Sequence, residues 1–188
     1  TSYTGTNIPS SATIKGETWT VQAVPNDGYQ DGSYGEAAII IQNTAPTVSA
    51  MSISPTAPTT SDILSCIGAS FDADGDSISE SYVWTNETTG VMIGSASTMN
   101  LSPLLISPGD SISCTYVVDD GSDSGSQASV VNIVNTDPVI DSLTVVPSSP
   151  YLGDTLTCLG MVTDEDLETT TESYVWENQT TGDILSTS

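Results

Sequence analysis

Three aspartates stand at alternate positions in the run DADGD, as Asp72, Asp74 and Asp76. Carboxylates at alternate positions of a tight loop can converge on one cation, and oxygen ligands of this kind suit Ca²⁺, while Gly75 permits the turn. The run is not an EF-hand, because the twelfth residue counted from Asp72 is Val83, which cannot supply that motif's bidentate carboxylate. The alternative is a solvated turn, since turns favour Asp and Gly without any ion.

The composition excludes several classes of function. The chain of 188 residues has 24 Asp and Glu against one Lys, no Arg and no His, and a formal net charge of −23. Binding to nucleic acid or to an anionic membrane surface needs several cationic side chains, and catalysis by His is impossible. The absence of an apolar run of membrane length argues against direct membrane insertion. The acidity favours solubility, with binding of hard cations as an added role.

The sequence repeats itself at a spacing of 92 residues. The run SYVW occurs at 81–84 and again at 173–176, and NETTG at 86–90 corresponds to NQTTG at 178–182. Near the start of the chain, KGETWTVQAVPNDG corresponds to PGDSISCTYVVDDG with a spacing of 93. A period of this size indicates tandem domains rather than a solenoid. We therefore expect the C-terminal half of one repeat at 1–42, a complete repeat at 43–134 and the N-terminal half of the next at 135–188.

Each repeat has the pattern of an all-β domain. Short runs rich in β-branched and aromatic residues occur at 63–71, 81–86, 111–118 and 128–134, with Gly, Pro, Asp, Asn and Ser between them. In the third run, alternate apolar residues predict one buried face. Several short strands in about 90 residues predict a sandwich of two antiparallel sheets.

Cys66, Trp84 and Cys114 follow one another in an order that resembles the immunoglobulin-like sandwich. Together with the DADGD, YVW, VVDDG and NTAP runs, the chain resembles the tandem Ig-like and PKD-like repeats of very large bacterial and archaeal surface proteins. The resemblance implies an all-β fold of tandem immunoglobulin-like β-sandwich repeats of about 92 residues. It also implies a disulfide between Cys66 and Cys114. Cys158 is then expected to pair with a cysteine beyond residue 188, whereas the first repeat lacks the bond because Val21 stands in the place of Cys114.

The resemblance further implies that two acidic loops and the incoming linker meet at one end of each sandwich. Asp119 and Asp120 would lie beside the DADGD loop, and Asn43 would reach both from the linker. A Ca²⁺ ion held there would stiffen the joint between two repeats. In the third repeat the same positions hold Asp164, Asp166 and Asn135, whereas Leu167 and Glu168 replace Gly75 and Asp76.

Two further signals are weak. Asn86, Asn100 and Asn178 begin N-x-[ST] triplets, which arise often by chance in a chain rich in Ser and Thr. Pairs of carboxylates could suggest a glycosidase, but that chemistry needs a cleft and a fixed carboxylate separation, which repeated loop residues do not provide. No enzymatic activity is therefore expected.

These observations favour a structural module of an extracellular or cell-surface filament, stalk or appendage. Its partners would be copies of itself end to end, with lateral association as a further expectation. Outward apolar contacts would come from positions such as Ile39 and Ile41 or Leu104 and Ile106, with a place in the core as the alternative for either pair. The alternative is a ligand-binding adhesin whose loops recognise a glycan or protein on another cell. Exposed loop aromatics suited to that role occur only in DGYQDGSYG, which contains Tyr29 and Tyr34.

Overall fold

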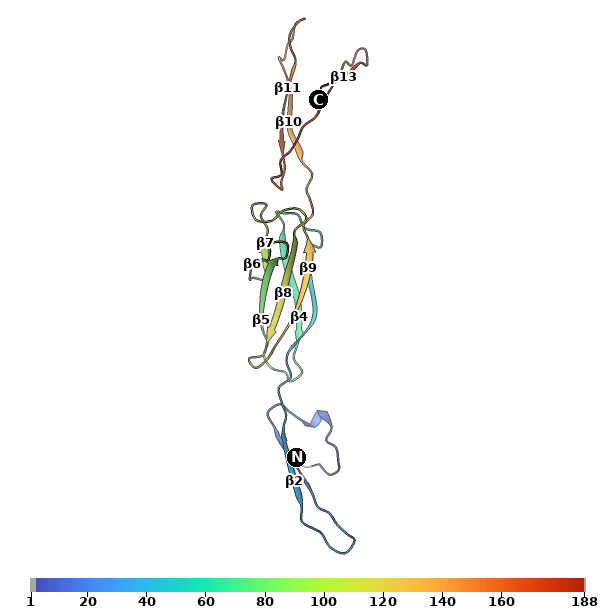
Figure 1. The fold of residues 1–188 in the computed structure, drawn as a ribbon, viewed down its shortest axis with the longest axis vertical. Helices are drawn as coiled ribbons and strands as arrows, with labels where there is room; N and C mark the ends of the chain where they lie inside the picture. The colour runs from blue at the N-terminus through green and yellow to red at the C-terminus, as the bar shows by residue number, and fades with distance from the viewer. Residues whose placement is uncertain (1–2, 188) are drawn as a thin grey trace.

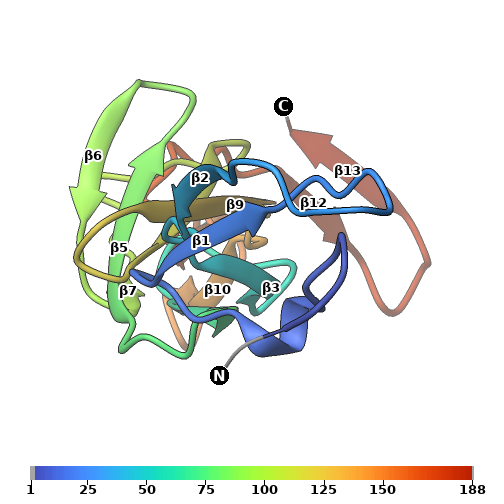
Figure 2. The same ribbon diagram turned by 90° about the horizontal axis from the view of Figure 1, so that it is seen from below.

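The computed structural model describes residues 3–187, so Thr1, Ser2 and Ser188 of the two expected partial repeats lie outside the described residues. The chain is all-β, as predicted, with one turn of 3-10 helix, η1, at Ser10–Ala12. In Figure 1 three sections follow one another along the long axis, and the view along that axis in Figure 2 shows them one behind another. We call them the N-terminal section (3–42), the central section (43–134) and the C-terminal section (135–187). Among these residues, no helix is long and apolar enough to cross a membrane.

The central section contains two antiparallel sheets. One has three strands in the order β3-β4-β7, and the other has four in the order β6-β5-β8-β9. The strands are short runs in which β-branched and aromatic residues recur between turn-forming residues. Their bounds are β3 Thr47–Ser54, β4 Ile63–Phe71, β5 Ser79–Asn86, β6 Val91–Gly94, β7 Thr98–Asn100, β8 Ser111–Asp119 and β9 Ser124–Asn132.

The hydrophobic core lies between these two sheets, as expected for a β-sandwich. Four residues of one parity in β8 are completely buried, which confirms the face predicted from the alternation: Ile112, Cys114, Tyr116 and Val118. Trp84 of β5 is also completely buried, and its indole Nε1 donates a hydrogen bond to the carbonyl oxygen of Ala96 at 2.8 Å. A disulfide joins Cys66 of β4 to Cys114 of β8, with their Cα atoms 6.3 Å apart. It ties the two sheets together through the core.

The two end sections contain only two-stranded sheets among the described residues. β1 (Thr18–Ala23) pairs with β2 (Gly35–Ile40) in the N-terminal section. In the C-terminal section β10 (Val139–Val146) pairs with β11 (Thr157–Thr163), and β12 (Tyr174–Glu177) pairs with β13 (Ile184–Thr187). A two-stranded sheet has no second layer to cover its apolar face, so it is marginally stable on its own.

The backbone of the end sections nevertheless copies the central section. The pairing of β3 with β4 starts at Thr47↔Phe71 and shifts register between Val48 and Ala50. The pairing of β10 with β11 starts at Val139↔Thr163 and shifts between Ile140 and Ser142, at the same points 92 residues later. β1 and β2 likewise correspond to β8 and β9 in register. The repeat in the sequence is therefore a repeat of backbone geometry.

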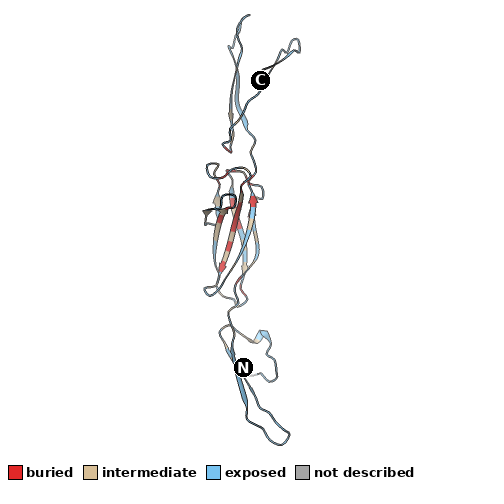
Figure 3. Cartoon of the chain, viewed as in Figure 1, coloured by how far each residue is buried: buried red, intermediate tan, exposed pale blue. Residues whose placement is uncertain are grey.

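Side-chain burial differs sharply between equivalent positions. Ile53 and Leu64 are 3% and 0% exposed in the central section, whereas their counterparts Val145 and Leu156 are 46% and 45% exposed. Val21, the counterpart of the fully buried Cys114, is 59% exposed. Figure 3 shows the same contrast, with the buried residues concentrated in the central section and the end strands largely exposed. Among the described residues, the end sections therefore expose apolar side chains whose counterparts form the core of the central section.

One of the two expected apolar pairs is divided between the core and the surface, so the outward placement is wrong for Ile106 and the core alternative holds for it. Ile106 is 1% exposed and belongs to the core, although its neighbour Leu104 points to solvent. The turn from Ser102 to Ile106, closed by the Ile106 backbone N–H donating to the Ser102 carbonyl at 3.0 Å, carries Ile106 inward. Ile39 is exposed, and Ile41 is half-buried.

Candidate functional site

The loop after β4 is organised by one buried carboxylate. Asp72 Oδ1 accepts hydrogen bonds from the backbone N–H groups of Asp74 at 2.8 Å and Asp76 at 3.1 Å. Gly75 has a φ of 78°, which glycine adopts without the steric cost that other residues meet. The other oxygen, Asp72 Oδ2, is buried and has no hydrogen-bond partner among the described residues. A buried carboxylate oxygen without a partner is unfavourable unless a cation or donor satisfies it.

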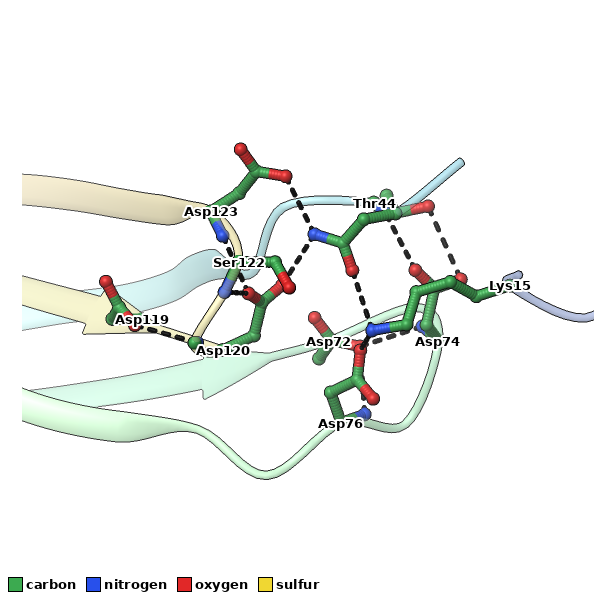
Figure 4. Close-up of polar contacts among 11 residues, drawn as sticks. Lys15, Thr44, Asp72, Asp74, Asp76, Asp119, Asp120, Ser122 and Asp123 are labelled. Atoms are coloured by element: carbon green, nitrogen blue, oxygen red, sulfur yellow. Dashed lines mark hydrogen bonds and ion pairs between the residues drawn. The ribbon is translucent and has the colours of Figure 1, made fainter. Parts of the chain in front are cut away.

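The linker between the N-terminal and central sections is bound to both acidic loops (Figure 4). The backbone N–H of Thr44 donates to Asp74 Oδ2 at 2.7 Å. The side-chain amide of Asn43 donates to Asp120 Oδ2 at 2.9 Å and to Asp123 Oδ2 at 2.8 Å. These bonds fix the linker between the loop after β4 and the turn between β8 and β9. We call this region the first joint.

Lys15, the sole basic residue of the chain, also lies at the first joint. Its Nζ donates to Asn43 Oδ1 at 2.9 Å and forms an ion pair with Asp76. The hydrogen bond to Asp76 is the main reason that the pKa of Lys15 is raised above its ordinary value. Lys15 comes from the N-terminal section and Asp76 from the central section, so this ion pair bridges the two.

The turn between β8 and β9 uses its two aspartates differently. Asp119 is exposed, and its Oδ1 accepts from the Gly121 backbone N–H at 2.8 Å, which closes the turn. Asp120 Oδ1 accepts from the backbone N–H groups of Ser122 and Asp123 at 2.7 and 2.8 Å. The bond from Asp123, followed by the amide of Asn43, lowers the pKa of Asp120 below its ordinary value.

Three carboxylates from the two loops converge at the first joint. Asp72, Asp76 and Asp120 each place one oxygen within 4.8 Å of the others, and we call them the first acidic cluster. Ca²⁺ takes six to eight oxygen ligands, some of them water, and carboxylates are its preferred protein ligands. The unpartnered Asp72 Oδ2 is a free oxygen of that type. This set of oxygen ligands therefore fits a hard cation. Lys15 neutralises part of the negative charge of the first acidic cluster through its ion pair with Asp76.

A second acidic cluster lies between the central and C-terminal sections. It consists of Asp164, Asp166 and Glu168, again with one oxygen from each within 4.8 Å of the others. Asp166 is buried and accepts hydrogen bonds from the Thr136 backbone N–H at 2.6 Å and from the Thr60 hydroxyl of the central section. No basic residue replaces Lys15 here. We call the region between the central and C-terminal sections the second joint. Neutral donors, the Thr136 N–H and the Thr60 hydroxyl, bind the acidic cluster there.

The structure brings together most of the residues predicted to hold a cation. Asp72, Asp76 and Asp120 form one cluster, Asp74 binds the linker at Thr44, and Asn43 binds Asp120 from the linker. The Asp119 carboxylate accepts a hydrogen bond within its own turn, from the Gly121 backbone N–H, and does not belong to the cluster. Within residues 3–187, Asn135 donates only to the carbonyl of its neighbour Thr136, at 3.1 Å, and makes no side-chain bond to the second cluster.

Besides the threonines Thr44, Thr60 and Thr136, three of the charged residues at the joints were not predicted from the sequence. Glu168 joins the second cluster, and its spacing of 92 from Asp76 was a signal for it. Lys15 is distinguished in the sequence only as the single cation. Asp123 binds Asn43 from a Ser-rich turn and had no signal at all.

The three glycosylation triplets lie in different environments. Asn86 is 1% exposed, its amide donates to Asp110 Oδ2 at 2.8 Å, and its Oδ1 accepts from the Thr88 backbone N–H at 3.0 Å. A buried amide used as both donor and acceptor leaves no room for a glycan in the folded protein. Asn100 and Asn178 are exposed, and Asn178 anchors a turn through its Oδ1.

No model of a known protein family matches this chain, and no curated protein sequence matches it either. The function is therefore inferred from the residues and their geometry.

Proposed function

We propose that this chain is a structural repeat module of a long extracellular filament, stalk or surface appendage. The observation that carries the proposal is the first joint, where Asn43 and Thr44 of the linker bind both acidic loops, and Lys15 of the N-terminal section bonds to Asn43 and to Asp76. Such bonds fix the direction of one section relative to the next, as a load-carrying rod requires. A flexible tether would need no contacts of this kind.

The strand arrangement supports an immunoglobulin-like sandwich for the central section. The orders β3-β4-β7 and β6-β5-β8-β9 correspond to the strand sets A-B-E and C′-C-F-G of that fold. The disulfide between β4 and β8 takes the place of the B–F bond, and Trp84 on β5 takes the place of the strand C tryptophan. The disulfide also supports an extracellular location, because such bonds persist in oxidising compartments.

Calcium is proposed as the ion of the joints. The support is the convergence of carboxylate oxygens without any soft ligand, together with the unpartnered buried Asp72 Oδ2. The ion would neutralise loops that repel one another and would hold the linker between them. Its effect is expected on the stiffness of the joint more than on the folding of the central section, which has its own core and disulfide.

Removing calcium is expected to make the full chain more flexible. Small-angle scattering with Ca²⁺ and then with EDTA should show a loss of extended conformers. In Asp72→Asn, the amide oxygen still accepts the loop N–H groups, but calorimetry should show roughly tenfold weaker Ca²⁺ binding because a charged ligand is lost. Asp141→Asn, an exposed residue of β10, is the control with the same change in net charge. Identical scattering in Ca²⁺ and EDTA, with no heat of binding, would reject the calcium proposal.

Electron microscopy of the full-length native protein tests the filament itself. We expect uniform fibres with an axial repeat of one or two sandwich lengths, roughly 40 Å each from strand and loop dimensions. Discrete globular particles at physiological ionic strength would overturn the proposal.

The adhesin alternative has one structural observation in its favour. Tyr29 is 95% exposed on the loop between β1 and β2, and this loop forms one extremity of the molecule in Figure 1. Aromatic rings on exposed loops suit sugar binding. Binding on a glycan array that Tyr29→Ala abolishes would favour this function over a purely mechanical one.

A further inference from the structure

Lys15 binds oxygens that an ion at the first joint would also use. Its Nζ donates to Asn43 Oδ1 at 2.9 Å and is paired with the carboxylate of Asp76, a member of the first acidic cluster. In Figure 4 the side chain reaches from the N-terminal section to the loop after β4. A carboxylate oxygen and an amide carbonyl oxygen are both ligands that Ca²⁺ takes. The ammonium group therefore covers part of the place in which the ion would lie.

Lys15 satisfies only part of the first acidic cluster. Asp72 is 7% exposed, and its Oδ2 has no hydrogen-bond partner among residues 3–187. Within the same residues, the bonds of the Lys15 ammonium go to Asn43 and Asp76 and not to Asp72. A buried carboxylate oxygen without a partner is unfavourable. A divalent ion with several ligands could bind Asp72, Asp76 and Asp120 together, which one ammonium group does not do.

An ion and the Lys15 ammonium repel one another at this place. Ca²⁺ lies about 2.4 Å from its oxygen ligands, and an ammonium nitrogen lies about 2.8 Å from a carboxylate oxygen. Two cations on the Asp76 carboxylate would therefore be no more than about 7 Å apart. The side chains of Lys15 and Asp76 are only 31% and 29% exposed, so water screens this repulsion incompletely. Binding of the ion is thus expected to expel the ammonium group.

We propose that Lys15 is a tethered competitor of the ion, so that the first joint is held either by Lys15 or by Ca²⁺. This inference rests on the proposed function, because it concerns the regulation of the calcium site proposed there. When the ion enters, Lys15 leaves Asp76, and Asn43 Oδ1 becomes free to coordinate the ion. When the ion leaves, Lys15 returns and bridges the N-terminal and central sections without it.

The second joint lacks this exchange. In the sequence repeat, Pro108 stands where Lys15 stands, and Lys15 is the only basic residue of the chain. Asp166 of the second acidic cluster is bound by the neutral donors of Thr136 and Thr60. Only the first joint is therefore expected to replace one cation with another.

The signal of a single lysine tests the exchange. In the full chain labelled with ¹³C-lysine, the NMR order parameter of the Lys15 Cε group should fall by about half when Ca²⁺ is added, because the side chain leaves its ion pair. NaCl at the same ionic strength is the control for screening and should leave the order parameter nearly unchanged. In Asp72→Asn the fall should need roughly tenfold more Ca²⁺. Since Asp72 makes no bond to Lys15 within the described residues, its effect can reach Lys15 only through the ion.

Calorimetry on matched variants measures the competition. Lys15→Gln removes the competing charge, and we expect it to bind Ca²⁺ at the first joint at least about fivefold more tightly. Lys15→Arg keeps a cation of similar reach and should stay within about twofold of the unchanged chain. The binding step that Asp72→Asn weakens identifies the first joint in these titrations.

The outcomes separate this inference from the function on which it rests. Calcium binding that leaves the Lys15 order parameter unchanged, or that Lys15→Gln does not strengthen, overturns the exchange and keeps the calcium proposal. An order parameter that falls equally in NaCl also overturns the exchange, because screening alone would then free Lys15. No calcium binding in either the unchanged chain or Lys15→Gln overturns both the exchange and the calcium proposal, and leaves the filament to be decided by electron microscopy.

Discussion

Replacing Trp84 with alanine is expected to lower the free energy of unfolding by about 3–5 kcal/mol. The side chain is completely buried between the two sheets, so its removal leaves a cavity that rigid strands cannot close. It also leaves the Ala96 carbonyl without the indole N–H that donates to it at 2.8 Å. Denaturant unfolding of the full chain, followed by circular dichroism, measures the change.

Trp176 is the matched control for this prediction. It occupies the equivalent position in the same SYVW run but is only half-buried in the C-terminal section. In dilute monomer, Trp176→Ala should therefore cost much less than Trp84→Ala. Equal losses of unfolding free energy in the two variants would show that the contribution of Trp84 to stability does not come from its burial in the closed core.

Removing the Cys66–Cys114 disulfide is the second large effect. The bond closes a loop with a sequence separation of 48. In the chain-entropy model, cross-linking a loop of that length restricts the unfolded state and stabilises the fold by about 4 kcal/mol. The double substitution Cys66→Ala and Cys114→Ala should lose about that much in denaturant unfolding, and its m-value should rise because the unfolded chain exposes more surface.

Cys158→Ala is the control for the disulfide prediction, since it removes a thiol that makes no bond within the described residues. Its stability should equal that of the unchanged chain under reducing and oxidising conditions alike. Intact-mass measurement before and after reduction counts the bonds. No gain in mass on reduction, or a double variant as stable as its parent, would contradict the assignment of one strong disulfide.

Local patterns predicted much of the central section. The parity of β8 identified its buried face, because side chains alternate between the two faces of a strand. The repeat at 92 predicted which strands of the end sections share a register, since equal sequences meet equal steric constraints. Ile106 escaped prediction because a turn, rather than strand alternation, sets its direction.

The candidate site was less predictable, because its contacts join residues far apart in the sequence. Asp72, Asp76 and Asp120 could be grouped from loop positions that the fold resemblance supplied. Lys15 could not, since its ion pair with Asp76 depends on how one section meets the next. Sequence patterns report local conformation well, whereas contacts between sections depend on their packing.

The position of Lys15 has a consequence for the resistance of the chain to proteases. Trypsin-like proteases cleave after Lys or Arg, and this chain offers them a single peptide bond, Lys15–Gly16. To enter the protease's specificity pocket, the Lys15 side chain must first leave Asp76 and Asn43. Digestion by such proteases is therefore restricted to one peptide bond per chain. The contacts of Lys15 with Asp76 and Asn43 at the first joint protect that bond. The same residue is also the only side-chain target for amine-reactive labels, so attaching one there would report on the joint and disturb it at once.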